Sequence, residues 1–157
     1  MMTKCNVVSG AKYITITTRH HDGFSLFKTA TSTYNSVDGT PFKRDIIKEM
    51  ADACQRNGIK LHLYYSHLDW GREDYPVGRT GTGTGRPKEK ANWPSYYKFM
   101  NTQLTELLTN YGKVGAIWFD GWWDHDSDAK PFDWQLEEQY ALIHKLQPQC
   151  LIANNHH

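Results

Sequence analysis

The sequence predicts an α/β fold in which about four parallel strands alternate with three helices. Two observations carry this prediction: β-branched and apolar runs recur along the chain, and the stretches between them repeat their apolar residues at helical spacing. The turns from helix to strand are short, so successive strands should lie side by side and parallel. A doubly wound open sheet and part of a (β/α)8 barrel both contain such units. A whole barrel needs about 250 residues and this chain has 157, so a barrel here would be a partial, TIM-like one.

The first strand is expected at Lys12–Thr18, where β-branched residues dominate. The first helix should begin with Thr40 as its N-cap and Pro41 in the first helical position, and Gly58 should end it. Its apolar stripe comprises Ile46, Ile47, Met50, Ala51 and Cys54. The stripe predicts that one side of this helix packs on the sheet.

The second strand, Ile59–Tyr65, leads into a long segment that reaches about Trp93 and is rich in glycine from Gly78 to Gly85. Because the stretch from Gly78 to Gly85 does not run from a strand directly into a helix, it is predicted to be a flexible surface insertion rather than a phosphate-binding loop. A second helix should follow, from about Pro94 to the residue before Gly112. Its buried face is expected to comprise Met100, Leu104, Leu107 and Leu108.

The third strand is expected at Val114–Phe119 and the fourth at Cys150–Asn154. Between them, Trp134–Leu146 has the pattern of a helix, which Pro148 closes. No linker composition interrupts the chain, so residues 1–157 are expected to belong to one domain.

The composition excludes some classes of function. The chain has 18 basic and 17 acidic residues and a net charge of +1, so it offers no basic field for nucleic acid. No apolar run approaches the roughly 20 residues of a membrane span. The cysteines, Cys5, Cys54 and Cys150, have no metal-ligand spacing. Six Trp and nine Tyr favour a carbohydrate or another ring-bearing ligand, or else an aromatic core.

Polar and aromatic residues gather where each predicted strand ends. The groups are Arg19–Asp22, Tyr64–His67 with Asp69–Trp70, Asp120–His125 and Asn154–His157. The opposite turns, such as Asn57–Gly58 and Tyr111–Lys113, carry nothing comparable. Parallel α/β folds bind ligands at the carboxyl ends of their strands. The asymmetry therefore predicts an active site at that end of the sheet.

Several kinds of chemistry could occur at such a site. A metal centre could draw on His20, His67, Asp120, His125 and His156. However, His20 and His21 are adjacent, and on a strand they would point to opposite faces. Ser66 lacks the glycine-flanked elbow of serine hydrolases, and no cysteine ends a strand. Carboxylate chemistry on a sugar remains.

Asp120 is the candidate nucleophile, because it follows the apolar run Ala116–Phe119 and is separated by Gly121 alone from the tryptophan pair Trp122–Trp123. Indole faces cover the apolar C–H patches of a pyranose. The residues expected to grip hydroxyls and ring faces are His20, His21, Tyr65 and Trp70.

The chain resembles the α-L-fucosidases of glycoside hydrolase family 29. The matching segments are Gly10–Tyr13 through Thr18–Phe24, Tyr64–Ser66 with Asp69–Trp70, Leu107–Gly112 and Ile117–Gly121. The resemblance extends from about Ser9 to His157, and the paired histidines and the Trp-Phe-Asp-Gly segment make it specific.

This resemblance implies a retaining exo-glycosidase that removes terminal α-linked L-fucose from glycans without metal or organic cofactor. Asp120 matches the nucleophile. The residues matched to sugar contacts are His20 and His21, one of Tyr64 and Tyr65, Trp118, and at the pocket rim Trp70. His156 lies near the place of a common family arginine and is included among the expected sugar contacts. The family implies a secreted, periplasmic or lysosomal location.

The acid/base of the family is usually a glutamate beyond the strand that ends in Asn154-Asn155, and Glu137 and Glu138 lie on the wrong part of the fold to replace it. An early histidine and tryptophan of the family also have no counterpart here. We therefore expect the central part of a catalytic barrel, truncated at both ends, weakly active or inactive alone and prone to self-association through exposed sheet edges. A non-catalytic fucose-binding module and a metal-dependent barrel hydrolase remain as alternatives.

Overall fold

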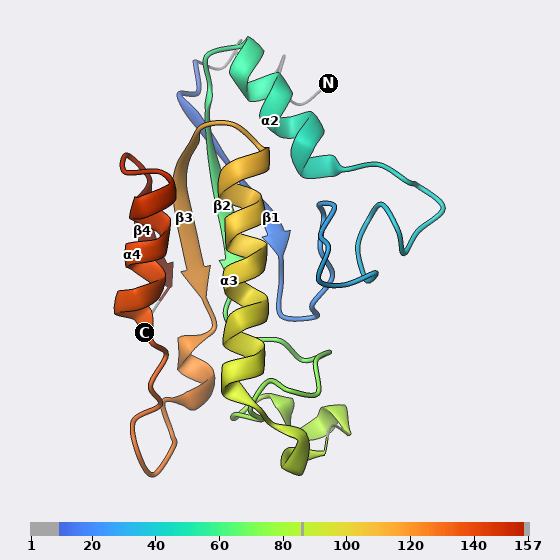
Figure 1. Ribbon diagram of the computed structural model, residues 1–157, viewed down its shortest axis with the longest axis vertical. Coiled ribbons are helices and arrows are strands. Elements are labelled where there is room, and N and C mark those ends of the chain that lie inside the picture. Colours follow the sequence, from blue (N-terminus) through green and yellow to red (C-terminus); the bar gives the residue numbers. More distant parts are fainter. Residues whose placement is uncertain (1–9, 86, 156–157) are drawn as a thin grey trace.

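The computed structural model describes residues 10–85 and 87–155, which form one parallel sheet with helices packed on it (Figure 1). The strands are β1 (Tyr13–Arg19), β2 (Lys60–Ser66), β3 (Val114–Asp120) and β4 (Leu151–Asn155). The α-helices are α2 (Ile46–Arg56), α3 (Trp93–Asn110) and α4 (Leu136–Leu146), and the 3-10 turns are η1 (Gly81–Thr84), η2 (Lys88–Lys90) and η3 (Trp122–His125). The predicted α/β class is confirmed, with its elements in the predicted order.

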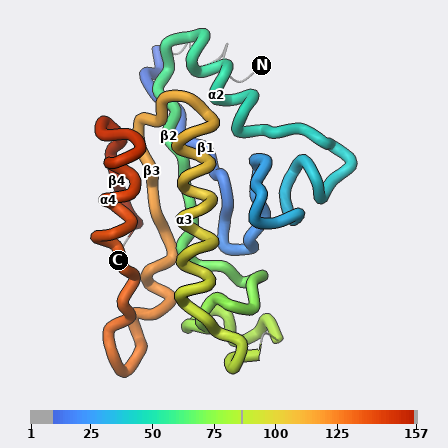
Figure 2. Tube along the Cα trace, viewed as in Figure 1, coloured from blue at the N-terminus to red at the C-terminus, as the bar shows by residue number. Residues whose placement is uncertain are grey.

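The strands lie in the sheet in chain order, β1-β2-β3-β4, and every neighbouring pair is parallel. The tube in Figure 2 shows the chain advancing across the sheet in one direction. In a doubly wound sheet the direction in which successive strands are added reverses at a switch point, whereas a barrel adds each strand beside the previous one. The order therefore agrees with a partial barrel and not with the doubly wound alternative.

The two faces of the sheet differ because side chains alternate along each strand. On β2, Leu63 and Tyr65 are fully buried beneath the helices, while Tyr64 belongs to the opposite, open face. On β3, Phe119 is fully buried and Trp118 is 41% exposed on the open face. The helices contribute the predicted stripes to the core, including Ile47, Ala51, Cys54, Met100, Leu104, Leu107 and Leu108.

Two helices begin later than predicted, and backbone geometry explains both. Lys43 has a φ of 55°, which interrupts any helix begun at Pro41. Helix α2 instead uses Asp45 as its N-cap, whose side chain accepts a hydrogen bond from Lys48 N at 2.8 Å. Gln135 has a φ of 53°, so α4 begins after it rather than at Trp134.

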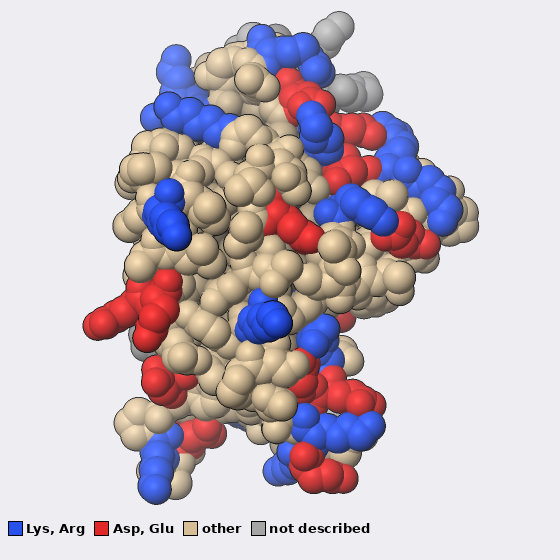
Figure 3. Space-filling model, viewed as in Figure 1, with Lys and Arg blue, Asp and Glu red and all other residues tan. Residues whose placement is uncertain are grey.

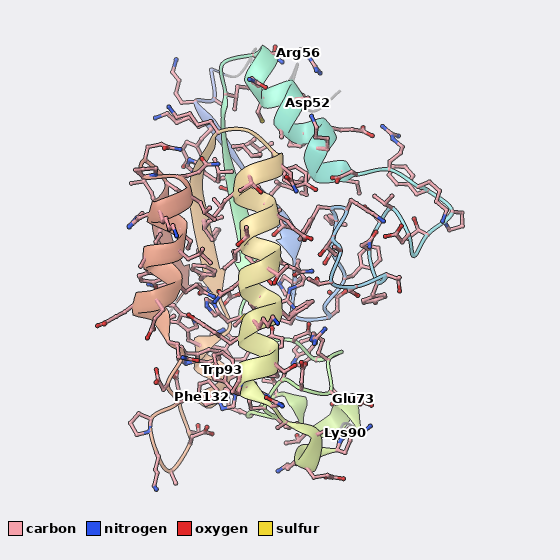
Figure 4. All side chains as sticks on the ribbon, in the orientation of Figure 1. Asp52, Arg56, Glu73, Lys90, Trp93 and Phe132 are labelled. Carbon is pink, nitrogen blue, oxygen red and sulfur yellow. The ribbon has the colours of Figure 1, made fainter. Side chains whose placement is uncertain are left out.

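Side-chain contacts fasten the long connections to the fold. Lys90 Nζ lies 2.8 Å from Glu73 Oε2 at the surface of the β2–α3 connection (Figure 4). Trp93, at the start of α3, packs edge-on against Phe132 with ring centroids 4.9 Å apart (Figure 4). Charges of both signs are interspersed on the face shown in Figure 3. In the part of the chain that the structure describes, no helix has the length and apolar character needed to cross a lipid bilayer.

The open face of the sheet and its edges lead to a first prediction. Strands β1 and β4 each pair with only one other strand among the described residues, and the open face exposes Tyr13 by 58% and Leu151 by 67%. Both features favour pairing with another chain. We expect the 157-residue chain to self-associate in light scattering, and Leu151→Lys to reduce this association. A monomer at every concentration, with cooperative unfolding, would contradict the prediction.

Candidate active site

Asp120 is the last residue of β3, and the sheet register places it opposite Ser66 on β2 and Asn155 on β4. The chain turns away directly after it, because Gly121 adopts a φ of +106°. A Cβ at Gly121 would also lie 2.7 Å from the Cβ of Leu68, so only glycine fits without a shift. The strand therefore presents the carboxylate at the carboxyl end of the sheet, as predicted.

Four donors surround the carboxylate of Asp120. Tyr64 Oη donates to Oδ2 at 2.6 Å, while Gly121 N and Trp123 Nε1 donate to Oδ1 at 2.8 and 2.9 Å. Asn155 Nδ2 lies 3.4 Å from Oδ1. Burial alone would raise the pKa of Asp120, but the hydrogen bonds, led by that of Tyr64, lower the pKa below its usual value. The carboxylate is therefore ionised and fixed in orientation, as a nucleophile requires.

His20 and His21 both lie beside this carboxylate. Their ring centroids are 4.1 Å apart, and His20 stacks on Tyr64 at 5.3 Å. The expectation that adjacent histidines point to opposite faces is wrong here, because β1 ends at Arg19 and the two histidines follow in a turn. Both are thus brought to the site.

The hydrogen bonds of His21 define which ring nitrogen carries the proton. Ser66 Oγ donates its only proton to Leu68 O at 2.6 Å, so His21 Nδ1, 2.7 Å from Ser66 Oγ, must be the donor of that contact. Burial, with a smaller contribution from His20, lowers the pKa of His21 to about 4, so the ring is neutral at pH 7. Its Nε2 then carries a lone pair and faces Asp120 Oδ2 at 3.7 Å.

The structure distinguishes the two tyrosines. Tyr64 belongs to the site through Asp120. Tyr65 points to the helix side, where it is fully buried, donates to Gln103 Oε1 at 2.8 Å and lies beneath the Arg19 guanidinium, 4.6 Å from the ring centroid. The expected sugar contact of Tyr65 is therefore wrong, because strand alternation places it in the core.

Tryptophan rings border the site. Trp118 meets Tyr64 edge-on at 5.9 Å, and Trp70 and Trp123 meet His21 edge-on at 5.3 and 5.4 Å. Trp70 and Trp118 were predicted. Trp123 was missed as a contact of Asp120, although its place three residues after Asp120 was a signal that could have revealed it. His156 lies outside the described residues.

Asp124 anchors the glycine-rich connection beside the site. Its Oδ1 accepts hydrogen bonds from Thr80 N at 2.8 Å and Thr80 Oγ1 at 2.6 Å, and Thr80 Oγ1 also accepts from Trp70 Nε1 at 3.0 Å. A Cβ at Gly78 would lie 2.3 Å from Asp124 Oδ2. The segment is thus held against η3 at this point, in contrast to the predicted flexible insertion.

A buried ion pair joins the ends of β1 and β2. Arg19 Nη1 contacts Asp69 Oδ2, and Arg19 Nη2 donates to Ser66 O at 2.5 Å and to Tyr96 Oη at 2.9 Å. Next to this pair, Trp70 N donates to His21 O at 2.6 Å. Arg19 is fully buried, so its role is to hold the two loops that carry His21 and Trp70 rather than to contact a ligand.

Two buried neutral histidines predict a pH-dependent stability. Burial lowers the pKa of His67 to about 3; its Nδ1 accepts from Trp122 Nε1 at 3.1 Å, and its Nε2 therefore donates to Gln139 Oε1 at 2.6 Å. The pKa of His21 is likewise low, at about 4. The unfolded chain takes up these protons near pH 6.5, so stability is fully present above about pH 6.5 and is lost as the pH falls toward about 4 for His21 and about 3 for His67.

The expected slope is at most about 1.4 kcal/mol per pH unit for each histidine. Urea unfolding across this pH range should show this slope of the unfolding free energy against pH, and His67→Gln should make the slope shallower. His144→Gln, at an exposed position on α4, is the matched control and should leave the slope unchanged. An unaltered slope in His67→Gln would contradict the assignment.

Comparisons with known proteins agree with this geometry. The family model described as Alpha-L-fucosidase matches residues 2–157. Alpha-L-fucosidase 1 of Arabidopsis thaliana is 32% identical over 150 residues, covering 94% of this chain and 26% of that protein. Plasma alpha-L-fucosidase of Rattus norvegicus is 33% identical over 145 residues, covering 89% and 28%. The chain thus spans about a quarter of the length of these curated relatives.

Solved structures show the same likeness. Alpha-L-fucosidase AlfC from Lactobacillus casei, in complex with its alpha-L-fucose product, superposes with a TM-score of 0.83 at 30% identity, covering 96% of this chain and 49% of that one. Alpha-L-fucosidase from Vibrio sp. strain EJY3 gives a TM-score of 0.87 at 31% identity, covering 96% and 26%. From the fold, the site at Asp120 and these matches, the chain belongs to the alpha-L-fucosidase family.

Proposed function

We propose that the chain forms the nucleophile-bearing part of a catalytic barrel that hydrolyses terminal α-linked L-fucose from glycans with retention of configuration. The observation that carries this proposal is the ionised carboxylate of Asp120, oriented by Tyr64, Gly121 and Trp123 at the carboxyl end of β3. A carboxylate fixed in this way among indole rings suits attack on the anomeric carbon of a sugar.

In the first step, Asp120 Oδ2 forms a bond to the anomeric carbon while the bond to the leaving oxygen breaks, and a carboxylic acid donates a proton to that oxygen. In the second step, the resulting carboxylate takes a proton from water. The water oxygen attacks the anomeric carbon, which releases fucose and restores Asp120. The same carboxyl group thus serves as acid and then as base.

We propose that this acid/base lies outside residues 10–155. Two of the acidic side chains that follow the described strands are engaged: Asp69 pairs with Arg19, and Asp124 accepts hydrogen bonds from Thr80 and Tyr75. A general acid must reach the leaving oxygen with a proton to give, and groups held by such donors are poorly suited to carry one.

The sugar would bind over the open face at Asp120. His21 Nε2, as an acceptor, would receive a hydrogen bond from a fucose hydroxyl, and His20 would contact a neighbouring hydroxyl. Trp118, Trp70 and Trp123 would cover the apolar side of the ring. This assignment is supported by the ring geometry around His21 and Tyr64.

The decisive experiment uses the full-length polypeptide that contains this chain and a mechanism-based fluorinated fucoside. Mass spectrometry should find the label on Asp120. Asp124→Asn is a matched control and should still be labelled at Asp120, whereas Asp120→Asn should not be labelled. A label on a different residue would refute the proposal.

A fucose-binding module without catalysis is the second candidate, favoured by the engagement of Asp69 and Asp124. It predicts fucose binding without turnover in the full-length polypeptide. Hydrolysis of an aryl α-L-fucoside would exclude it.

We also propose that the protein acts outside the cytosol, in a secreted or lysosomal setting. The support is that relatives include proteins named plasma and tissue alpha-L-fucosidase, both from Homo sapiens. Localisation of the tagged full-length polypeptide to the cytosol would overturn this.

A further inference from the structure

We propose that His20, His21 and Asp120 also form a binding site for a late transition-metal dication, such as Zn²⁺ or Cu²⁺. Each residue offers one ligand atom, and these atoms all lie within 4.8 Å of one another. A cation bound here would also occupy the place of the sugar and exclude it. This exclusion rests on the proposed function, whereas the binding of the cation does not.

The turn after β1 creates the site. Because β1 ends at Arg19, the two following imidazoles both lie beside Asp120 instead of on opposite faces of the sheet. Adjacent histidines on a strand would not have this arrangement. Two nitrogens from one turn and one oxygen from β3 thus approach the same point from two elements.

The donor atoms have lone pairs to offer. The chain of hydrogen bonds from His21 Nδ1 through Ser66 Oγ to Leu68 O leaves His21 Nε2 unprotonated and facing Asp120 Oδ2 at 3.7 Å. Ligand atoms of a tetrahedral zinc ion, each about 2.0–2.2 Å from the metal, lie roughly 3.4 Å apart. The His21–Asp120 pair would therefore need to close by only a few tenths of an ångström, while exposed His20, whose ligand atom lies within 4.8 Å of theirs, would turn toward the ion.

The surroundings resemble the support that metal ligands usually have. Ser66 orients His21 through its second nitrogen, and Tyr64 and Trp123 orient Asp120. Two imidazoles and one carboxylate suit Zn²⁺ or Cu²⁺ better than Mg²⁺ or Ca²⁺, which prefer oxygen. Three protein ligands leave a fourth position open to water.

The test is calorimetric titration of the 157-residue chain with Zn²⁺, accompanied by the electron paramagnetic resonance spectrum of bound Cu²⁺. A His156→Ala/His157→Ala background removes two further imidazoles that could bind the ion. We expect one ion per chain and a Cu²⁺ spectrum with nitrogen couplings. His20→Ala and Asp120→Asn should each weaken Zn²⁺ affinity at least about tenfold. His144→Ala, which removes an exposed imidazole on α4, should leave it unchanged.

His20 is exposed, so His20→Ala keeps the test valid even if changes at buried His21 disturb folding. Undiminished Zn²⁺ affinity in both His20→Ala and Asp120→Asn would overturn the proposal. L-Fucose and Zn²⁺ should compete in the full-length polypeptide, and simultaneous binding would overturn the exclusion. If Zn²⁺ binds as expected but no fucoside is bound or hydrolysed, the proposed function fails while the cation site stands.

Discussion

Asp120→Asn should lower the turnover of an aryl α-L-fucoside by the full-length polypeptide by a factor of about 10³ or more, with fucose affinity nearly unchanged. The amide is too weak a nucleophile to form the covalent intermediate. It fits the site, because its oxygen can accept from Gly121 N and Trp123 Nε1 in place of Oδ1, while its NH₂ group donates to Tyr64 Oη. The variant should therefore remove chemistry while preserving the fold.

The control for this variant is Asp126→Asn, the same change at an exposed position just after η3. It should retain full turnover. Retention of more than about a tenth of the activity by Asp120→Asn would show that another group attacks the sugar.

Tyr64→Phe should shift the pH dependence of turnover while leaving the nucleophile in place. Loss of its 2.6 Å hydrogen bond raises the pKa of Asp120, because that bond is the largest of the contributions that lower it. Since the nucleophile must be ionised, the acidic limb of the pH–rate profile should move to higher pH. A profile in which the acidic limb does not move would contradict the role given to Tyr64.

The sequence was sufficient to predict the order of strands and helices, because each apolar run has a clear period and each connection is short. It could not decide between Tyr64 and Tyr65, because the face of a strand residue depends on the register with its neighbours. That register, Tyr64 opposite Trp118 and Tyr65 opposite Phe119, is a property of the assembled sheet.

The end of β1 is a second feature that the sequence could not predict. A strand that continued past Arg19 would have separated His20 from His21, and no local signal fixes that boundary to one residue. Nor does the sequence indicate that Arg19, which stands in the polar group after the first strand, is fully buried beneath α3. Its partner Asp69 is distant in sequence, so the pair exists only once β1 and β2 lie side by side.

Arg19→Met should lower the free energy of unfolding by about 3–5 kcal/mol, because it removes the guanidinium that balances the buried charge of Asp69. Asp69 would lose the guanidinium, and Ser66 O and Tyr96 Oη would each lose a hydrogen bond. The measurement is urea unfolding at a fixed protein concentration. Lys48→Met, which breaks the exposed Lys48–Asp52 pair on α2, is the control and should change stability by less than about 1 kcal/mol.

A double variant separates the stabilisation that the Arg19–Asp69 ion pair provides from the destabilisation that results when only one of its buried charges remains. In Arg19→Met/Asp69→Asn neither member of the ion pair is charged, so the loss should be smaller than the sum of the two single losses. Additive losses would show that the two side chains act independently.

Because Arg19 and Asp69 hold the loops that carry His21 and Trp70, each single variant should also weaken fucose binding, even though neither residue faces the site. A variant that lost stability but bound fucose normally would show that these loops keep their positions without the ion pair.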